Sequence, residues 1–178
     1  MESTRSSGDG SASHIPRMRR AMPSDVGAVS TLLKRAFQEF EPLYTPEAFI
    51  ATVQPASGIL KRLEEGPLWV AENKHSIVGT VAAVWAADSV MVRGMAVAPK
   101  ARGLRIGKAL LQVAEDFAHE QGFDRMSLYT TAFLLRAIRL YQSSGFEFTG
   151  ETASPHGTEL LRMVKILGSE VGTKTLGK

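Results

Sequence analysis

Residues 97–111 read VAPKARGLRIGKALL, and this stretch is the most informative part of the chain for its fold and function. Its first residues end an apolar strand. Its last residues begin an amphipathic helix, with apolar side chains at helical spacing: Ile106, Ala109, Leu110, Val113, Ala114 and Phe117. The connection between them is basic and carries two glycines: Lys100, Arg102, Gly103, Arg105, Gly107 and Lys108. A helix start presents unpaired N–H groups and the positive end of the helix dipole, so the junction favours a phosphorylated ligand. A solvated basic turn is the alternative.

Two patterns in the second half of the chain resemble the GNAT family of N-acetyltransferases. The acetyl-CoA signature of that family, Gln/Arg-x-x-Gly-x-Gly/Ala, is matched by residues 102–107, with Arg105 in place of its first glycine. A later pattern, Asn-x-x-Ala-x-x-x-Tyr-x-x-x-Gly-Phe, is matched by residues 134–146, with Leu134 in place of the asparagine. Arg105 either crowds the diphosphate or points outward, and Leu134 removes one hydrogen bond near the ligand. The resemblance covers residues 15 to 167.

The order of elements predicts an α/β fold with a mixed sheet. Antiparallel strands come first, a strand–helix–strand unit follows, and helices are expected on both faces. The resemblance implies a mostly antiparallel sheet of about six to seven strands with about four helices. It also implies that two central strands splay apart at a bulge. Gly94 suits such a bulge or, alternatively, close packing beside Trp85.

The first half of the chain is expected to contain two helical regions. Ser24 is the predicted N-cap of a helix that continues to Phe37. Thr45 is the predicted cap of the second region, which Pro55 and Gly58 are expected to interrupt. We expect residues 14–167 to form one domain, with a disordered tail at 1–13 and a flexible tail at 168–178.

Composition excludes several classes of protein. The chain has 178 residues, of which 44% are hydrophobic, enough for one domain with a substantial core. It has no cysteine, which excludes disulfides, a thiolate nucleophile and Cys-based zinc sites. No apolar run approaches the roughly 20 residues that cross a bilayer. A cytoplasmic protein without membrane contact or a bound metal is therefore the expectation.

The positive charge of the chain is local. Four arginines against two acids in residues 1–20 account for +2 of the net +3, so the remainder is nearly neutral. A nucleic-acid-binding face would require clustered cations on one surface, and the basic loop is too small for that. No nucleic-acid partner is expected.

The resemblance implies acetyl-CoA as co-substrate and direct transfer of its acetyl group to a primary amine in a ternary complex. It assigns these residues to the acetyl-CoA site: Met95, Ala96, Val97, Arg102, Gly103, Leu104, Arg105, Ile106, Gly107 and Lys108. The N–H groups of Met95 and Val97 would contact the pantetheine and the acetyl carbonyl. The acceptor is expected to be a small-molecule or peptide amine, and a homodimer remains open.

Tyr141 is the predicted general acid, because the family places this tyrosine near the sulfur of coenzyme A. A packing role is the alternative, since its neighbours Ala137 and Leu140 share its apolar face. The general base is not identified. Many relatives carry a glutamate on the strand before the glycine loop, where this chain has residues 91–94, MVRG. Glu72, Asp88, His156 and a water molecule remain candidates.

The acceptor pocket is expected between two segments that the family brings together, residues 37–44 and 154–158. Glu39 and Glu41 could attract a cationic amine. Arg93 is interpreted as structural or as a contact to an acidic part of the acceptor.

Two other functions are alternatives to the acetyltransferase. A P-loop hydrolase needs four residues between its glycines and Ser or Thr after the lysine. Here three residues separate Gly103 from Gly107, and Ala109 follows Lys108, so that class is excluded. A non-catalytic acyl-CoA-binding module remains the alternative, because the strand glutamate and two signature residues are replaced.

Overall fold

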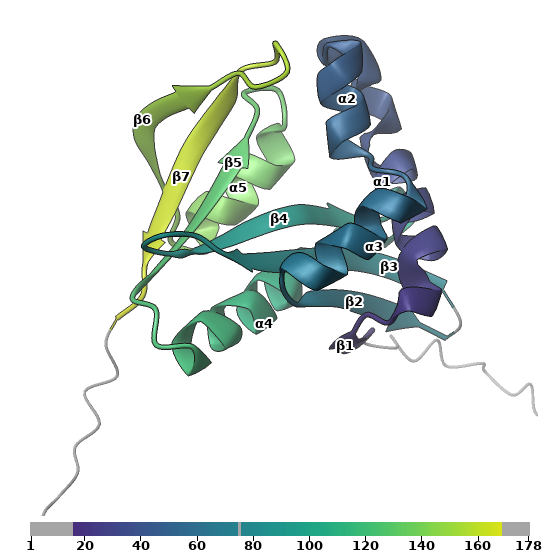
Figure 1. The fold of residues 1–178 in the computed structure, drawn as a ribbon, viewed down its shortest axis with the longest axis horizontal. Coiled ribbons are helices and arrows are strands. Elements are labelled where there is room, and N and C mark those ends of the chain that lie inside the picture. Colours follow the sequence, from purple (N-terminus) through teal and green to yellow (C-terminus); the bar gives the residue numbers. More distant parts are fainter. Residues whose placement is uncertain (1–15, 75, 169–178) are drawn as a thin grey trace, which may run out of the picture.

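The computed structural model describes residues 16–74 and 76–168. The predicted tail at 1–13 lies outside these residues, as does the predicted tail at 168–178 apart from Gly168. The described part contains one sheet with the strand order β1-β2-β3-β4-β5-β7-β6 (Figure 1). The strands are β1 (Arg17–Arg20), β2 (Leu68–Asn73), β3 (Ser76–Trp85), β4 (Val90–Val97), β5 (Arg125–Thr130), β6 (Glu147–Ala153) and β7 (Leu160–Ile166). Only β4 and β5 pair in parallel, which confirms the mixed, mostly antiparallel sheet.

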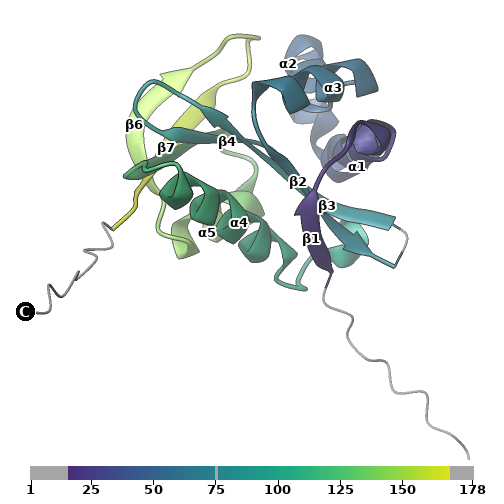
Figure 2. The same cartoon turned by 60° about the horizontal axis from the view of Figure 1, so that its bottom comes forward.

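Helices cover both faces of this sheet (Figure 2). The described α-helices are α1 (Val26–Phe37), α2 (Pro46–Thr52), α3 (Ala56–Glu65), α4 (Ile106–Glu120) and α5 (Leu135–Ser143). Short 3-10 turns precede or follow them at η1 (Pro23–Asp25), η2 (Gln38–Leu43) and η3 (Pro99–Ala101). Helices α1 and α3 pack on one face, and α4 packs on the other.

The period-2 alternation of strand side chains separates two apolar cores. In β2, Leu68 and Val70 belong to the core under α1 and α3, whereas Trp69 and Ala71 belong to the core under α4. The central strands are therefore buried on both faces. Their near-continuous apolar sequences follow from this double burial.

Two predicted helix boundaries are wrong, and one is confirmed. Ser24 lies inside η1, because Pro23 begins a helical turn earlier, and the N-cap position of α1 is Asp25. Gly58 does not interrupt a helix but lies within α3, which begins directly after Pro55. The separation of α2 from α3 gives one helix more than expected. Thr45 caps α2 as predicted, since its Oγ1 accepts a hydrogen bond from the Ala48 N–H at 3.2 Å.

The sheet opens between β4 and β5. The two strands pair only from Val90 to Val92, although β4 continues to Val97. The β3–β4 register shifts where Thr80 faces Ala96, because Gly94 adopts a φ of +55° and adds a residue to β4. The predicted bulge and splay are confirmed. The alternative, close packing beside Trp85, is wrong. Trp85 pairs with Val90, and the nearest atom to a Cβ on Gly94 would be Nη1 of Arg62, at 2.5 Å.

Candidate active site

A cavity of about 630 Å³ lies where β4 and β5 separate. Its walls come from the end of α1, η2, the end of β4, the loop before α4, and α5. The lining residues are Ala36, Phe37, Phe40, Met95, Ala96, Val97, Ala101, Arg102, Gly103, Arg105, Ile106, Gly107, Lys108, Leu134, Arg136, Ala137, Leu140 and Tyr141. The structure thus brings together all of the predicted site residues except Leu104, which is 60% exposed and does not line the cavity.

The N-terminus of α4 offers backbone donors at one wall of this cavity. The first N–H to bond back along the helix is that of Ala109, which donates to the Arg105 carbonyl at 3.1 Å. The N–H groups of Ile106, Gly107 and Lys108 precede this ladder, and in the described part of the chain no carbonyl accepts from them. Arg102 differs, because its N–H donates to the Pro99 carbonyl at 3.4 Å. Free donors at the positive end of a helix dipole suit a phosphate.

Gly107 allows a close approach between α4 and α5. A Cβ at this position would lie 2.7 Å from Cδ2 of Leu140 on α5 and 3.4 Å from Cε of Met95 on β4. Gly103, in contrast, has no atom within 4 Å of a Cβ, and its φ of +84° explains the preference for glycine there.

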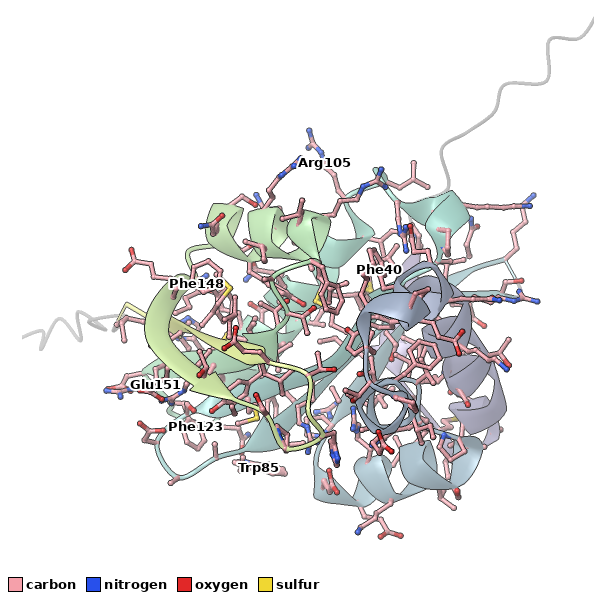
Figure 3. The ribbon with its side chains drawn as sticks, turned by 90° about the horizontal axis from the view of Figure 1, so that it is seen from above. Phe40, Trp85, Arg105, Phe123, Phe148 and Glu151 are labelled. Carbon is pink, nitrogen blue, oxygen red and sulfur yellow. The ribbon has the colours of Figure 1, made fainter. Side chains whose placement is uncertain are left out.

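Arg105 takes the left-handed conformation that glycine would adopt without strain, with φ +60°. An L-residue in this region costs about 1 kcal/mol. Its side chain lies at the outer edge of the molecule (Figure 3), as one of the two sequence-based alternatives proposed. The loop therefore keeps the backbone path expected of the signature despite the missing glycine.

The side chain of Arg102 extends from the loop before α4 to α1 and η2, which lie on the other face of the sheet. Its guanidinium forms an ion pair with Glu39 and donates to the Ala36 carbonyl at 2.9 Å. The contact ties the basic loop to the end of α1 and to η2. The positive charge of Arg102 is consequently shared with a carboxylate from the protein.

Arg136 is a cavity residue that sequence reasoning missed. It lies in the first turn of α5, at a position that the pattern matched by residues 134–146 leaves variable. Its positive charge is therefore the one sequence signal that could have indicated a role in ligand binding. Together with Arg102, Arg105 and Lys108 it places four cationic residues around the cavity, of which Arg102 is paired with Glu39.

Tyr141 both packs and lines the cavity. It is 8% exposed, and its ring meets Phe146 edge-on at 6.0 Å between centroids. Burial raises the pKa of Tyr141 to about 12, and the nearby Tyr44 adds to the rise. The phenol is therefore protonated at neutral pH and can donate a hydrogen bond into the cavity.

An aromatic cluster continues the wall from Phe40 towards β5. The rings of Phe40 and Phe133 are stacked, with 6.3 Å between their centroids. The ring of Tyr44 contacts Phe133 edge-on at 4.9 Å and lies tilted against Phe49 at 6.0 Å. In Figure 3, Phe40 lies on the side of η2 that faces α5. Burial raises the pKa of Tyr44. Apart from Tyr44, sequence reasoning missed this cluster, because Phe133 and Phe49 are far apart along the chain.

The two segments predicted to border the acceptor do meet. The N–H of Thr45 donates to Oγ1 of Thr158 at 2.9 Å, and Oγ1 of Thr45 donates to the His156 carbonyl. The start of α2 is thereby joined to the turn before β7. Glu39 is engaged by Arg102, and Glu41 is exposed.

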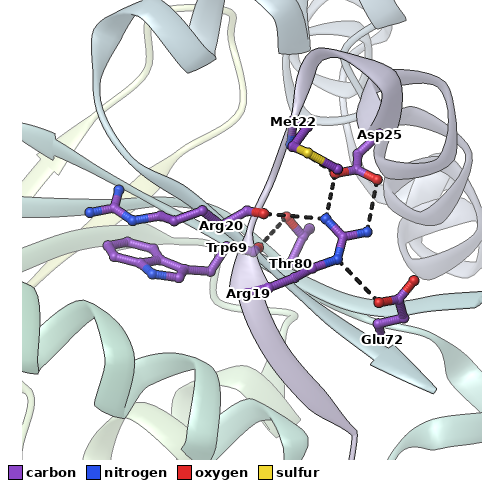
Figure 4. A network of polar contacts seen from close by, with 7 residues as sticks. All are labelled: Arg19, Arg20, Met22, Asp25, Trp69, Glu72 and Thr80. Atoms are coloured by element: carbon purple, nitrogen blue, oxygen red, sulfur yellow. Dashed lines mark hydrogen bonds and ion pairs between the residues drawn. The ribbon is translucent and has the colours of Figure 1, made fainter. Parts of the chain in front are cut away.

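The three candidate bases lie away from the cavity lining. Glu72 accepts from Nε of Arg19 at 3.1 Å, and Arg19 also binds Asp25 at 2.7 Å, so that the pKa of each acid is lowered (Figure 4). Asp88 pairs with Arg125 at 3.1 Å at the β3–β4 turn. His156 is exposed. No carboxylate is among the lining residues, so none of these side chains is placed to accept a proton there.

Residues 16–74 and 76–168 contain neither a metal-binding cluster nor a membrane-spanning helix. No three His, Asp or Glu side chains there are grouped so that they could hold a metal ion. No helix within the same ranges is both long and apolar enough to span a bilayer.

Comparison with protein families and curated proteins gives matches in one family. The model of the acetyltransferase (GNAT) family matches residues 28–146. N-acetyltransferase family 8 member 3 of Rattus norvegicus is 36% identical over 89 residues, which are 47% of this chain and 39% of that protein. N-acetyltransferase 8B of Homo sapiens is 37% identical over 90 residues, or 47% of this chain and 40% of that protein. The chain thus covers about two fifths of the length of these curated relatives.

Solved structures share the fold at low sequence identity. The PaiA N-acetyltransferase of Thermoplasma acidophilum, solved in complex with coenzyme A, aligns with a TM-score of 0.70 and 16% identity, covering 84% of this chain and 98% of that one. A GNAT-family acetyltransferase of Staphylococcus aureus Mu50 aligns with a TM-score of 0.71 and 21% identity, covering 85% and 99%.

Proposed function

The chain belongs to the GNAT acetyltransferase family, and from this premise we propose that it transfers the acetyl group of acetyl-CoA to a primary amine of a small molecule or peptide. One observation carries the proposal: the cavity at the β4–β5 opening is bordered by the unpaired N–H groups that begin α4. A phosphate-binding helix start beside an open strand edge suits a ligand with a diphosphate at one end and an extended arm.

The residues present fit acetyl-CoA. The N–H groups of Ile106, Gly107 and Lys108 would receive the diphosphate, with Arg105 and Arg136 adding positive charge. Beyond Val92, no strand of the described residues pairs with the edge of β4 that faces β5. Met95 and Val97 would therefore bind the pantetheine arm through their backbone. The remaining lining is mostly apolar. When bound, acetyl-CoA would supply an activated acyl carbon.

Transfer forms an N–C bond and breaks the C–S bond. The amine nitrogen loses one proton, and the sulfur gains one. The chain has no cysteine, so no Cys-acylated enzyme can intervene, and we propose direct transfer with both substrates bound. Tyr141 would donate a hydrogen bond to the sulfur as negative charge develops there. Since no carboxylate lines the cavity, the proton of the amine would leave through water.

Two measurements test this function. Titration with acetyl-CoA should give a Kd that rises with ionic strength, because cations and helix-start amides bind the phosphates. Release of free thiol from acetyl-CoA should then follow addition of suitable amines, within a panel of amino acids, peptides, polyamines and aminoglycosides. Binding without thiol release from any amine would favour the acyl-CoA-binding module. Absence of binding would contradict both functions.

The Arg102–Glu39 pair predicts opposite effects of two charge-removing changes. Glu39→Gln should lower the Kd for acetyl-CoA about two- to five-fold, because it frees the guanidinium and removes a negative charge near the phosphates. Arg102→Gln should raise the Kd by a similar factor. Isothermal titration at low salt measures both values.

Glu41→Gln is the matched control, because Glu41 lies on the same turn as Glu39 and is exposed. It should leave the Kd nearly unchanged. Equal affinities for all three variants would show that Arg102 serves only to hold η2 in place.

A further inference from the structure

Arg62 on α3 is a buried cation without a charged partner. Its relative exposure is 6%, and its Nε has no hydrogen-bond acceptor within the described residues. No carboxylate of these residues comes within 4 Å of the guanidinium; the nearby acid on the same helix, Glu65, pairs instead with Arg93 at 3.5 Å. Burial lowers the pKa of Arg62 to about 10, so the group is still charged at neutral pH. Arginine is rarely buried in this way unless it is paired.

The guanidinium lies against the bulge that opens the sheet. A Cβ on Gly94 would be 2.5 Å from Nη1 of Arg62, so the glycine leaves the space that the cation fills. The next residue, Met95, lines the cavity. Consecutive Cα atoms are about 3.8 Å apart. A ligand bound to Arg62 would therefore lie within a few ångströms of the strand segment that is proposed to hold the acyl group.

The position of Arg62 indicates which of the two substrates, acetyl-CoA or the acceptor, this side chain would bind. The phosphates of acetyl-CoA are assigned to the start of α4, and Arg62 does not line that cavity. Helix α3 packs on the other face of the sheet from α4. Arg93, which sequence reasoning considered for an acidic part of the acceptor, is partly exposed and already paired with Glu65. Arg62 thus keeps a buried positive charge that no acid of the described residues neutralises.

We propose that Arg62 binds the carboxylate of the acceptor, and that the acceptor is an amino acid whose amine lies a few bonds from this carboxylate. The proposal rests on the proposed acetyl transfer. A planar guanidinium binds a carboxylate through two parallel hydrogen bonds, which fixes the orientation of the ligand as well as its charge. This recognition would also compensate a buried charge that the protein alone leaves unpaired.

Matched pairs of acceptors test the recognition. Glycine, leucine, phenylalanine and glutamate are compared with their carboxamides in thiol release, at equal concentrations of the unprotonated amine. At least one free acid should exceed its amide in kcat/KM by about 10- to 100-fold, as expected for a hydrogen-bonded charge pair. Arg62→Met should reduce this ratio to about one by lowering the rate with the acid and not with the amide.

Two further variants separate recognition from a structural role. Lys61→Met removes an exposed charge from the same helix and should leave the ratio unchanged. Arg62→Lys keeps the charge without the planar fork and should retain part of the preference. Arg62→Met should melt at the same temperature as the native protein or above it, because replacing an unpaired buried charge with an apolar side chain is seldom destabilising. A marked fall in Tm would assign Arg62 to the fold.

The outcomes distinguish this inference from the proposed function. Equal rates with acids and amides would overturn the role of Arg62 and leave acetyl transfer intact. If no amine releases thiol, the proposed function fails. The role of Arg62 is then tested by ligand binding in place of turnover. Thermal shifts are then measured in the presence of coenzyme A with the N-acetyl derivatives of the same four amino acids and with their amides. Stabilisation by an acid form that Arg62→Met abolishes supports the proposal, and its absence refutes it.

Discussion

Tyr141→Phe should lower kcat about 100-fold while changing the Kd for acetyl-CoA less than about two-fold. The variant keeps the buried ring and its edge-on contact with Phe146 and removes only the hydroxyl. In the proposed mechanism the hydroxyl acts when charge develops on the sulfur, so its loss should affect the transition state more than the ground state. Single-turnover thiol release gives the rate, and isothermal titration gives the Kd.

The pKa of about 12 limits how Tyr141 can act. A thiol has a reference pKa near 8.5, so full proton transfer from this phenol to a thiolate is uphill. Hydrogen-bond donation is the role that this difference favours. Because the phenol remains protonated, kcat should show no decline from Tyr141 ionisation up to about pH 10.

The matched control for Tyr141 is Tyr129→Phe, since Tyr129 is 39% exposed on β5 and does not line the cavity. It should change neither kcat nor Kd. A Tyr141→Phe variant that loses affinity as much as turnover would show that the side chain only supports packing.

Gly66→Ala should lower the free energy of unfolding by about 2–3 kcal/mol. Gly66 ends α3, and a Cβ there would lie 2.3 Å from the backbone oxygen of Ala83. Ala83 is fully buried in β3, and its N–H donates to the Pro67 carbonyl at 2.9 Å, so the two backbones cannot separate without disturbing the central sheet. The φ of 164° is extended and adds no strain, so the close approach alone causes the loss. Urea denaturation followed by circular dichroism measures it.

Gly27→Ala provides the control for this change. Gly27 lies in α1, and nothing is within 4 Å of the added Cβ. Alanine should stabilise this helix by up to about 1 kcal/mol. A loss below about 1 kcal/mol for Gly66→Ala would mean that β3 shifts to accommodate the methyl group.

Much of the wall proposed to bind phosphate could be predicted from the sequence because it is local. The break at Pro99, the loop with Gly103, and the apolar spacing after Ile106 each act within a few residues, and together they set the start of α4. At Ser24 the preceding residue, Pro23, begins a helical turn earlier than the capping preference predicted. At Gly58 a glycine inside the first turn of α3 was expected to interrupt the helix, and the helix tolerates it.

On the side proposed for the acceptor, no local pattern predicted the contacts, and only the family resemblance indicated that residues 37–44 and 154–158 come together. The aromatic cluster joins Tyr44 to Phe133, and the contact of Thr45 with Thr158 spans 113 positions. The absence of a carboxylate from the cavity is likewise a property of the folded arrangement, since Glu72 and Asp88 are each engaged by an arginine elsewhere. Side chains so far apart in sequence have no local signal that links them.

The sequence by itself determined the succession of strands and helices along the chain and the backbone donors at the start of α4. Each of these features depends on residues that are neighbours in the sequence. Only the tertiary structure decided which charges are neutralised. Arg102 finds Glu39, 63 positions away, while Arg62 is buried against Gly94 without an anion. Charge pairing depends on which distant segments the sheet brings within a few ångströms, and that distance exists only in the folded chain.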